Sequence, residues 1–175
     1  EPRRLQIVRH TITSKNIPKS FNGIKILQFS DIHLGLSYDL LQLEQLMVTI
    51  NNLKPTIILF TGDLMDVPNE YPHPERIPPI LQRLQAPLGK YAIYGNHDHG
   101  GYGTNIYKQA IEDAGFRLLV NEVDTVSMPD KSYIHICGLD DIMLGNPQYE
   151  GTLGQLQPDI FSIAMIHEPD VAVKA

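Results

Sequence analysis

Short apolar runs recur along this chain, and polar residues with metal-binding chemistry follow four of them. The runs cover residues 24–29, 56–60, 91–94 and 161–166. Runs of this length, rich in β-branched and aromatic residues, predict β-strands. The polar groups that follow begin at Asp31, Gly62, Gly95 and His167. Four strands are therefore expected to deliver polar groups to one rim.

Helical patterns separate the first strands. Apolar residues recur at helical spacing from Leu40 to Leu53, Ser37 is a credible N-cap, and Pro55 closes the helix. Weaker patterns predict helices over 75–85 and 104–114, the second ended by Gly115. Strands that alternate with helices predict an α/β layer with ligands at the carboxyl ends of its strands.

The pattern changes after residue 116. Short runs over 117–120, 125–128 and 133–137, with turn residues between them, predict consecutive strands in a second sheet. An extended segment is expected over residues 5–13. The sequence has no internal repeat, low-complexity tract or linker, so residues 1–175 are interpreted as a single domain.

Composition narrows the class of protein. A chain of 175 residues with 42% hydrophobic content can bury a sizeable core. The single cysteine, Cys137, excludes a disulfide framework and a cysteine metal cage. A net charge of -6 argues against a broad nucleic-acid surface.

The charge is unevenly distributed. Residues 1–25 hold six Lys or Arg and one acid, a net +5, which leaves -11 for the remainder. Such a segment is able to face anionic lipid head groups, which predicts peripheral membrane contact. The alternative is an ordinary solvated edge strand. No apolar run is long enough to span a bilayer and no signal peptide is present.

The polar groups after the strands match the needs of a two-metal site. Two divalent cations about 3.5–4 Å apart can activate water and neutralise a phosphoryl group. A carboxylate can bridge such a pair, and Asp63 is assigned this place. Asp31 and His33 are assigned to one metal, and Asn96 and His167 to the other. This mixture of ligands without thiolate suits Mn, Fe or Zn.

Two further residues are predicted to act beside the metals. His97 directly follows Asn96 and is expected to face the substrate, as general acid or as a positive charge. Asp66, one helical turn after Asp63, is expected to hold the His97 ring and favour its protonated form.

Each motif has a simpler interpretation when taken alone. The first three resemble turns or a helix N-cap, His167 could be a core histidine, and Asp66 could be an acid at a helix start. Asp98 and His99 are near the predicted site, but a solvated loop explains them equally well. The remaining candidates, His10, His73, His135 and the pair Asp140-Asp141, receive no functional role.

The ordered motifs resemble the calcineurin-like metallophosphoesterase family, whose signature is D-x-H, G-D-x-x-D, G-N-H-D/E, a lone His and G-H-x-H. Asp31/His33, Gly62-Asp63 with Asp66, Gly95-Asn96-His97-Asp98 and His167 match the first four blocks. The N-terminal segment, residues 30–35 and residues 167–170 resemble a bacterial, often membrane-associated branch related to YkuE and to UDP-diacylglucosamine pyrophosphatases. The family implies an αββα sandwich.

One block of the signature is missing. No Gly-His-x-His follows His167 within the 175 residues, and the chain starts without Met, so we expect a fragment. Such a fragment would lack two histidine ligands of the family, and one edge strand of its second sheet would have no partner. In the resembled branch a membrane anchor or export signal often precedes the first residue. The localisation therefore stays open between the cytoplasm and the membrane of a bacterium.

The expected function is metal-dependent hydrolysis of a phosphoester or pyrophosphate by a metal-bridging hydroxide, on a lipid-linked or nucleotide-linked phosphate. A nuclease or cyclic-nucleotide phosphodiesterase and a non-catalytic metal-binding scaffold are the alternatives. Tyr71 and Tyr102, in loops near the rim, could stack on a base or line an acyl groove, or could be ordinary exposed tyrosines.

Overall fold

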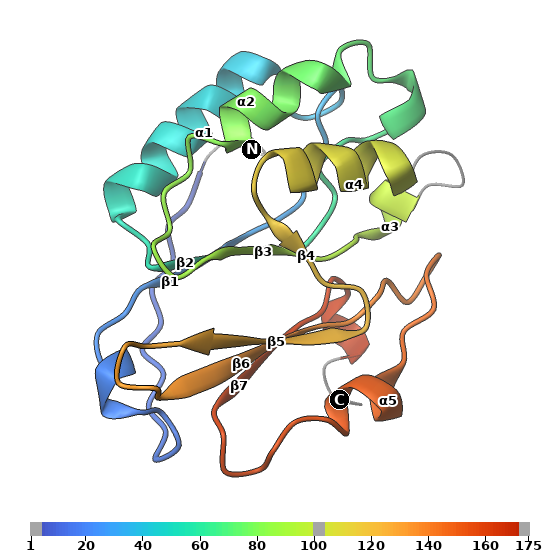
Figure 1. Cartoon of the computed structure of the whole chain (residues 1–175). Coiled ribbons are helices and arrows are strands. Elements are labelled where there is room, and N and C mark those ends of the chain that lie inside the picture. Colours follow the sequence, from blue (N-terminus) through green and yellow to red (C-terminus); the bar gives the residue numbers. More distant parts are fainter. Residues whose placement is uncertain (1–4, 100–103, 172–175) are drawn as a thin grey trace.

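The computed structural model describes residues 5–99 and 104–171, and two β-sheets lie against each other in it (Figure 1). The first sheet has the order β1 (Ile26–Phe29), β2 (Ile57–Phe60), β3 (Lys90–Ala92) and β4 (Arg117–Leu118). The second has the order β5 (Glu122–Ser127), β6 (Tyr133–Gly138) and β7 (Ser162–Met165). Helices α1 (Leu40–Leu53), α2 (Ile77–Leu81) and α4 (Thr104–Asp113) cover the outer face of the first sheet. The short helix α5 (Tyr149–Leu153) lies beside the second sheet, and the predicted α/β sandwich is confirmed.

The first sheet is parallel throughout, so the carboxyl ends of its strands share one edge. Its centre is β2, whose four residues are all buried, as expected for an apolar strand covered on both faces. Alternate residues of β2 point to opposite faces. Ile58 and Phe60 join the core under the helices, whereas Ile57 and Leu59 join the core between the two sheets.

Helix α1 begins two residues later than the sequence suggested. The Asp39 carboxylate accepts the Gln42 backbone N–H at 2.8 Å, and the Gln42 side chain accepts the Asp39 N–H at 2.9 Å. This reciprocal capping box makes Asp39 the N-cap, so the assignment to Ser37 was wrong. Lys54 ends the helix in a left-handed conformation with φ +54°, directly before Pro55.

Two other predicted elements differ in extent or position. The run at 117–120 was expected in the second sheet, but β4 pairs parallel with β3 because the turn at Gly115 returns the chain from α4 to that edge. The helix expected over 75–85 is shorter. A 3₁₀ turn (Pro74–Arg76) precedes α2, and the N–H groups of Arg83 and Leu84 bond three residues back, which tightens the chain and ends the helix.

The N-terminal segment forms no strand in the described part of the chain. Residues 5–13 were expected to form an extended segment, with a solvated edge strand as one alternative, yet they pair with neither sheet. Leu5, Val8 and Ile12 are 50%, 63% and 70% exposed. The described residues also contain no helix long and apolar enough to cross a membrane.

Candidate metal centre

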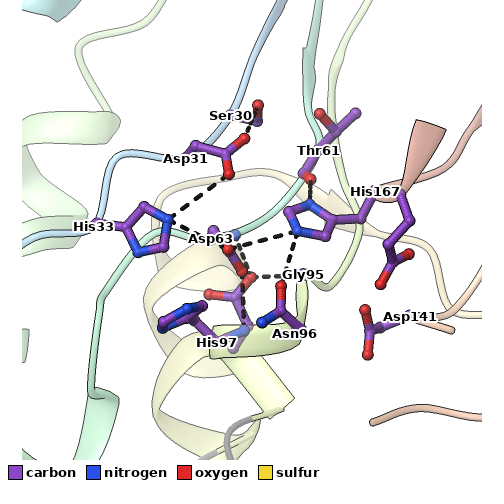
Figure 2. Close-up of polar contacts among 12 residues, drawn as sticks. Ser30, Asp31, His33, Thr61, Asp63, Gly95, Asn96, His97, Asp141 and His167 are labelled. Carbon is purple, nitrogen blue, oxygen red and sulfur yellow. Dashed lines mark hydrogen bonds and ion pairs between the residues drawn. The ribbon is translucent and has the colours of Figure 1, made fainter. Parts of the chain in front are cut away.

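Four strand ends bring the predicted ligands together at the edge between the two sheets (Figure 2). Asp31 follows β1, Asp63 follows β2, and Asn96 starts the short helix α3 (Asn96–His99) after β3. His167 follows β7 and so comes from the second sheet. The packing of the two sheets against each other therefore determines whether His167 reaches the other side chains.

Asp63 lies at the centre of this group and is 2% exposed. Its Oδ1 accepts the backbone N–H of His97 at 3.0 Å. Its Oδ2 lies 3.4 Å from His33 Nε2 and 3.5 Å from His167 Nε2. One oxygen is thus held by the backbone, while the other faces two imidazole nitrogens from opposite sides (Figure 2).

The outer candidate ligands form two pairs around Asp63. Asp31 Oδ1 lies 3.7 Å from His33 Nε2, and Asn96 Oδ1 lies 3.2 Å from His167 Nε2. His167 Nδ1 lies 2.7 Å from the Thr61 carbonyl oxygen, which can only accept, so Nδ1 donates. A neutral His167 therefore presents its Nε2 lone pair to the centre, the form that binds metal.

Asp66 lies beside both remaining imidazoles. Its Oδ1 is 3.2 Å from His33 Nδ1 and 3.4 Å from His97 Nδ1. The Asp66 carbonyl oxygen accepts from His97 Nδ1 at 2.7 Å. The two rings meet edge to face with centroids 4.5 Å apart. Asp66 thus orients the His97 ring, mainly through its backbone, and its carboxylate orients His33.

Strained backbone marks the same residues. The φ angles of Asp31, His33 and Asp63 are +56°, +46° and +61°. Residues other than glycine rarely adopt this left-handed region. Such strain persists where surrounding structure holds it, and it gathers at functional sites. Here the Asp31 and His33 N–H groups donate to the carbonyls of Gly62 and Asp63, which ties the first loop to the second.

Two glycines let the ligand loops approach each other. A Cβ on Gly62 would lie 2.3 Å from the Gly95 nitrogen, and a Cβ on Gly95 would lie 2.3 Å from Asp63 Oδ1. The Gly95 Cβ would also lie 2.8 Å from the His167 ring. Neither neighbour can move without displacing Asp63, so both positions require glycine.

Asp98 does not lie in a solvated loop, which was one of the two interpretations that the sequence left open. The residue is fully buried and accepts the backbone N–H groups of Asp63, Gly95 and Leu64 at 2.7, 2.9 and 3.1 Å. Burial raises the pKa of Asp98 to about 7, although its backbone donors act in the opposite direction. Asp98 joins the Asp63 loop to the Gly95 loop. Its place one turn after Gly95 was the available sequence signal.

His99 and the pair Asp140-Asp141 also have contacts that the sequence did not indicate. His99 packs on Tyr94 at 4.3 Å between centroids, and its Nε2 lies 2.6 Å from Asp140. Asp141 is fully buried and accepts from the Leu144 backbone at 2.5 Å. These contacts order the loop after β6 and attach it to α3, so His99 does not lie in a solvated loop either.

Electrostatics support a charged Asp63–His167 pair in the metal-free site. Burial opposes ionisation of Asp63, but the hydrogen bond and charge of His167 and the His97 N–H hold its pKa below the usual value. The hydrogen bond that His167 donates to Asp63 is the main cause that raises the pKa of His167 to about 9, although burial opposes it. Beside His167, burial and the neighbouring Asp141 raise the pKa of Glu168.

These residues fit divalent cations. Two groups of side chains, Asp31/Asp63/His167 and His33/Asp66/His97, each bring one ligand atom per residue within 4.8 Å of the others. A buried carboxylate oxygen between two imidazole nitrogens is a donor set of the kind that binds divalent metals. The sequence also predicted that Tyr71 and Tyr102 lie in loops that contact the substrate. Tyr71 is among the described residues, whereas Tyr102 lies outside them.

Comparison with known proteins agrees with this site. A model of the calcineurin-like phosphoesterase family matches residues 24–167. The chain belongs to the calcineurin-like phosphoesterase family, whose members are hydrolases acting on phosphoester bonds. The family resemblance seen in the sequence is thereby confirmed.

Several relatives are longer than this chain. The uncharacterized metallophosphoesterase YkuE of Bacillus subtilis is 50% identical over 174 residues, which are 99% of this chain and 61% of that protein. The UDP-2,3-diacylglucosamine pyrophosphatase LpxG of Chlamydia trachomatis is 38% identical over 105 residues, 58% of this chain and 31% of that protein. A transmembrane protein with a metallophosphoesterase domain from Danio rerio is 27% identical over 97% of this chain and 40% of its own length.

Proposed function

We propose that the protein hydrolyses a phosphoester or pyrophosphate bond with two divalent cations, Mn, Fe or Zn. The observation that carries this proposal is the position of Asp63 Oδ2, 3.4 Å and 3.5 Å from the Nε2 atoms of His33 and His167. A carboxylate at this position would be able to serve as a ligand to both ions. When bound, the ions supply an activated water and neutralise charge on the phosphate.

The pairs around Asp63 support one ligand set for each ion. Asp31 and His33 would hold one cation, and Asn96 and His167 the other, with Asp63 shared. The Thr61 carbonyl and the Asp66 carboxylate accept from the far nitrogens of His167 and His33. Such outer contacts fix the tautomer and the direction of a ligating imidazole.

His97 is proposed to act on the substrate directly. Its Nδ1 donates to the Asp66 carbonyl, its side chain is 35% exposed, and its ring lies against His33. With Nδ1 engaged, Nε2 is the atom available to donate a proton to a leaving oxygen or to face phosphate charge. Asp66 is proposed to position this ring.

The proposed substrate is a lipid-linked or nucleotide-linked phosphate. The name of the chlamydial relative, UDP-2,3-diacylglucosamine pyrophosphatase, states a substrate that carries both a nucleotide and acyl chains. That similarity supports the substrate class for this chain, and it leaves the individual compound open.

Metal titration of the full-length protein tests the proposal. We expect two Mn²⁺ per chain, with hydrolysis of p-nitrophenyl phosphate or its diester that disappears with chelator and returns with Mn²⁺. Asp63→Asn should remove binding at both sites. Asp159→Asn is the matched control, because Asp159 is exposed and precedes β7 at the end opposite to His167. Full turnover in chelator would contradict the proposal.

A further inference from the structure

A hollow of about 650 Å³ opens between the segment that follows His33 and the segment around Tyr71. Its volume is within the range of small-molecule sites. The first lining residue, Gly35, is two residues from His33, so their Cα atoms are at most about 7.6 Å apart. The hollow and a candidate metal ligand therefore share one short piece of chain.

That piece of chain is rigid. The His33 carbonyl accepts the N–H groups of Leu36 and Ser37 at 3.1 and 2.9 Å, and Gly35 donates to Tyr38 at 3.0 Å. The Tyr71 ring packs over Gly35, where a Cβ would lie 3.4 Å from it. These hydrogen bonds preform the wall of the hollow and fix its position relative to His33.

The larger part of the lining surface is apolar, and Arg76 is the one permanent cation that the described part of the chain places there. Leu36 and Leu41 line the hollow and are 69% and 62% exposed, which leaves large aliphatic surfaces in water. Arg76 also lines it and has no ion pair among the described residues. The other charged lining residue, Asp39, is occupied as the cap of α1.

We propose that this hollow binds the apolar chain of an amphiphilic phosphate whose phosphate group lies at the metal centre. The proposal rests on the proposed function and deepens it, because it locates the lipid part of the substrate. Three observations favour such an occupant: the hollow begins two residues after the candidate ligand His33, its two exposed leucines offer apolar surface, and Arg76, which has no ion pair among the described residues, gives it a positive charge that attracts an anionic amphiphile. Leu36 and Leu41 would then determine specificity without touching the reacting atoms.

Alkylphosphonates from methyl to octyl test this, because their C–P bond resists hydrolysis. Their affinity for the full-length protein with Mn²⁺ is measured by calorimetry. Once the chain reaches the hollow, each further methylene should strengthen binding by up to about fourfold. Affinity that does not rise with chain length would overturn the proposal.

Leu41→Ser and Val48→Ser are the matched pair of variants. Both residues are exposed on α1, but only Leu41 lines the hollow. Leu41→Ser should weaken octylphosphonate binding roughly fivefold to tenfold and leave methylphosphonate unchanged. Val48→Ser should change neither. Equal effects of the two substitutions would contradict the proposed position.

Other results separate this inference from the proposed function. Octylphosphonate binding that needs Leu41, found together with full hydrolytic turnover in chelator, would support the hollow and remove the metal-dependent function. Mn²⁺-dependent hydrolysis of aryl phosphate without any chain-length effect would keep the function and overturn the hollow. If Leu41→Ser instead turned a dimer into a monomer in ultracentrifugation, the occupant would be a second copy and the proposal would be wrong.

Discussion

The two candidate ligand groups at the rim are built in different ways. The first group, Asp31, Asp63 and His167, draws its residues from both sheets, and Asp63 at its centre is 2% exposed. His33, Asp66 and His97 belong to segments that follow strands of the first sheet alone, and all three are half-buried. The first group depends on how the two sheets pack, whereas the second depends on local turns tied by backbone hydrogen bonds.

This difference suggests a division of labour. The side chains of Asp63 and His167 are shielded from solvent, which suits ions held at fixed positions. His97 is more exposed and donates through Nδ1 to a carbonyl, which suits contact with a substrate that enters and leaves. Substitutions in the two groups should therefore produce different defects.

The largest effect is expected from Asp63→Asn. The amide presents only one oxygen and no charge, so both proposed ions lose a ligand and the two imidazoles lose their counter-charge. Activity should fall by more than the roughly 10²–10⁴-fold typical of losing an acid–base group. Metal content, measured by atomic emission, should fall with it. Parental turnover at saturating Mn²⁺ would exclude Asp63 as the shared ligand.

His97→Ala should separate chemistry from metal binding. We expect kcat to fall by about 10²–10⁴-fold because the proposed proton donor or positive charge is lost. Bound metal should stay at the parental level, because no proposed ligand is removed. The comparison is His167→Ala, which should lose metal as well as activity. Metal loss in His97→Ala would move His97 into the ligand set.

A smaller and purely structural effect is expected from Asp98→Asn. The amide group would place N–H against a backbone N–H, so at least one of three buried hydrogen bonds is lost. The free energy of unfolding should fall by about 1–3 kcal/mol in chemical denaturation. Asp113→Asn, on the exposed end of α4, is the control. No change in stability would mean that Asp98 does not hold the two loops together.

The sequence predicted the parts of this molecule that depend on local pattern. Leu40 to Leu53 form one helix, and Asp31, Asp63, Asn96 and His167 follow their strands as expected. In the parallel sheet, strand direction alone places the first three residues at one edge. The family signature was also visible, because its order does not depend on tertiary contacts.

What the sequence could not predict depends on contacts between distant residues. Burial of Asp98 follows from three backbone donors in two other loops, and a sequence pattern of one acid cannot show them. The strand at Arg117–Leu118 joined the first sheet because the turn at Gly115 directs it there, although its pattern suits either sheet. The orientation of His167 depends on the Thr61 carbonyl, 106 residues away.

The smallest effect expected is a pH dependence that belongs to the first group alone. The pKa of His167 is about 9 in the folded, metal-free chain, compared with 6.5 for an ordinary histidine, mainly because of its hydrogen bond to Asp63. The folded state thus binds this proton more tightly than the unfolded state. The resulting stabilisation is complete below pH 6.5 and is lost as pH rises through 9.

Metal should reverse this trend, because a cation can bind His167 only when the proton leaves. Thermal unfolding in chelator should therefore show a falling Tm between pH 6.5 and 9, and the gain in Tm from added Mn²⁺ should grow over the same range. His167→Gln should flatten the chelator curve. His73→Gln, which changes an exposed histidine paired with Glu75, should keep it. A parental chelator curve that stays level would show that the Asp63–His167 pair carries no net charge-dependent stability, and the contrast between the two groups would then rest on burial alone.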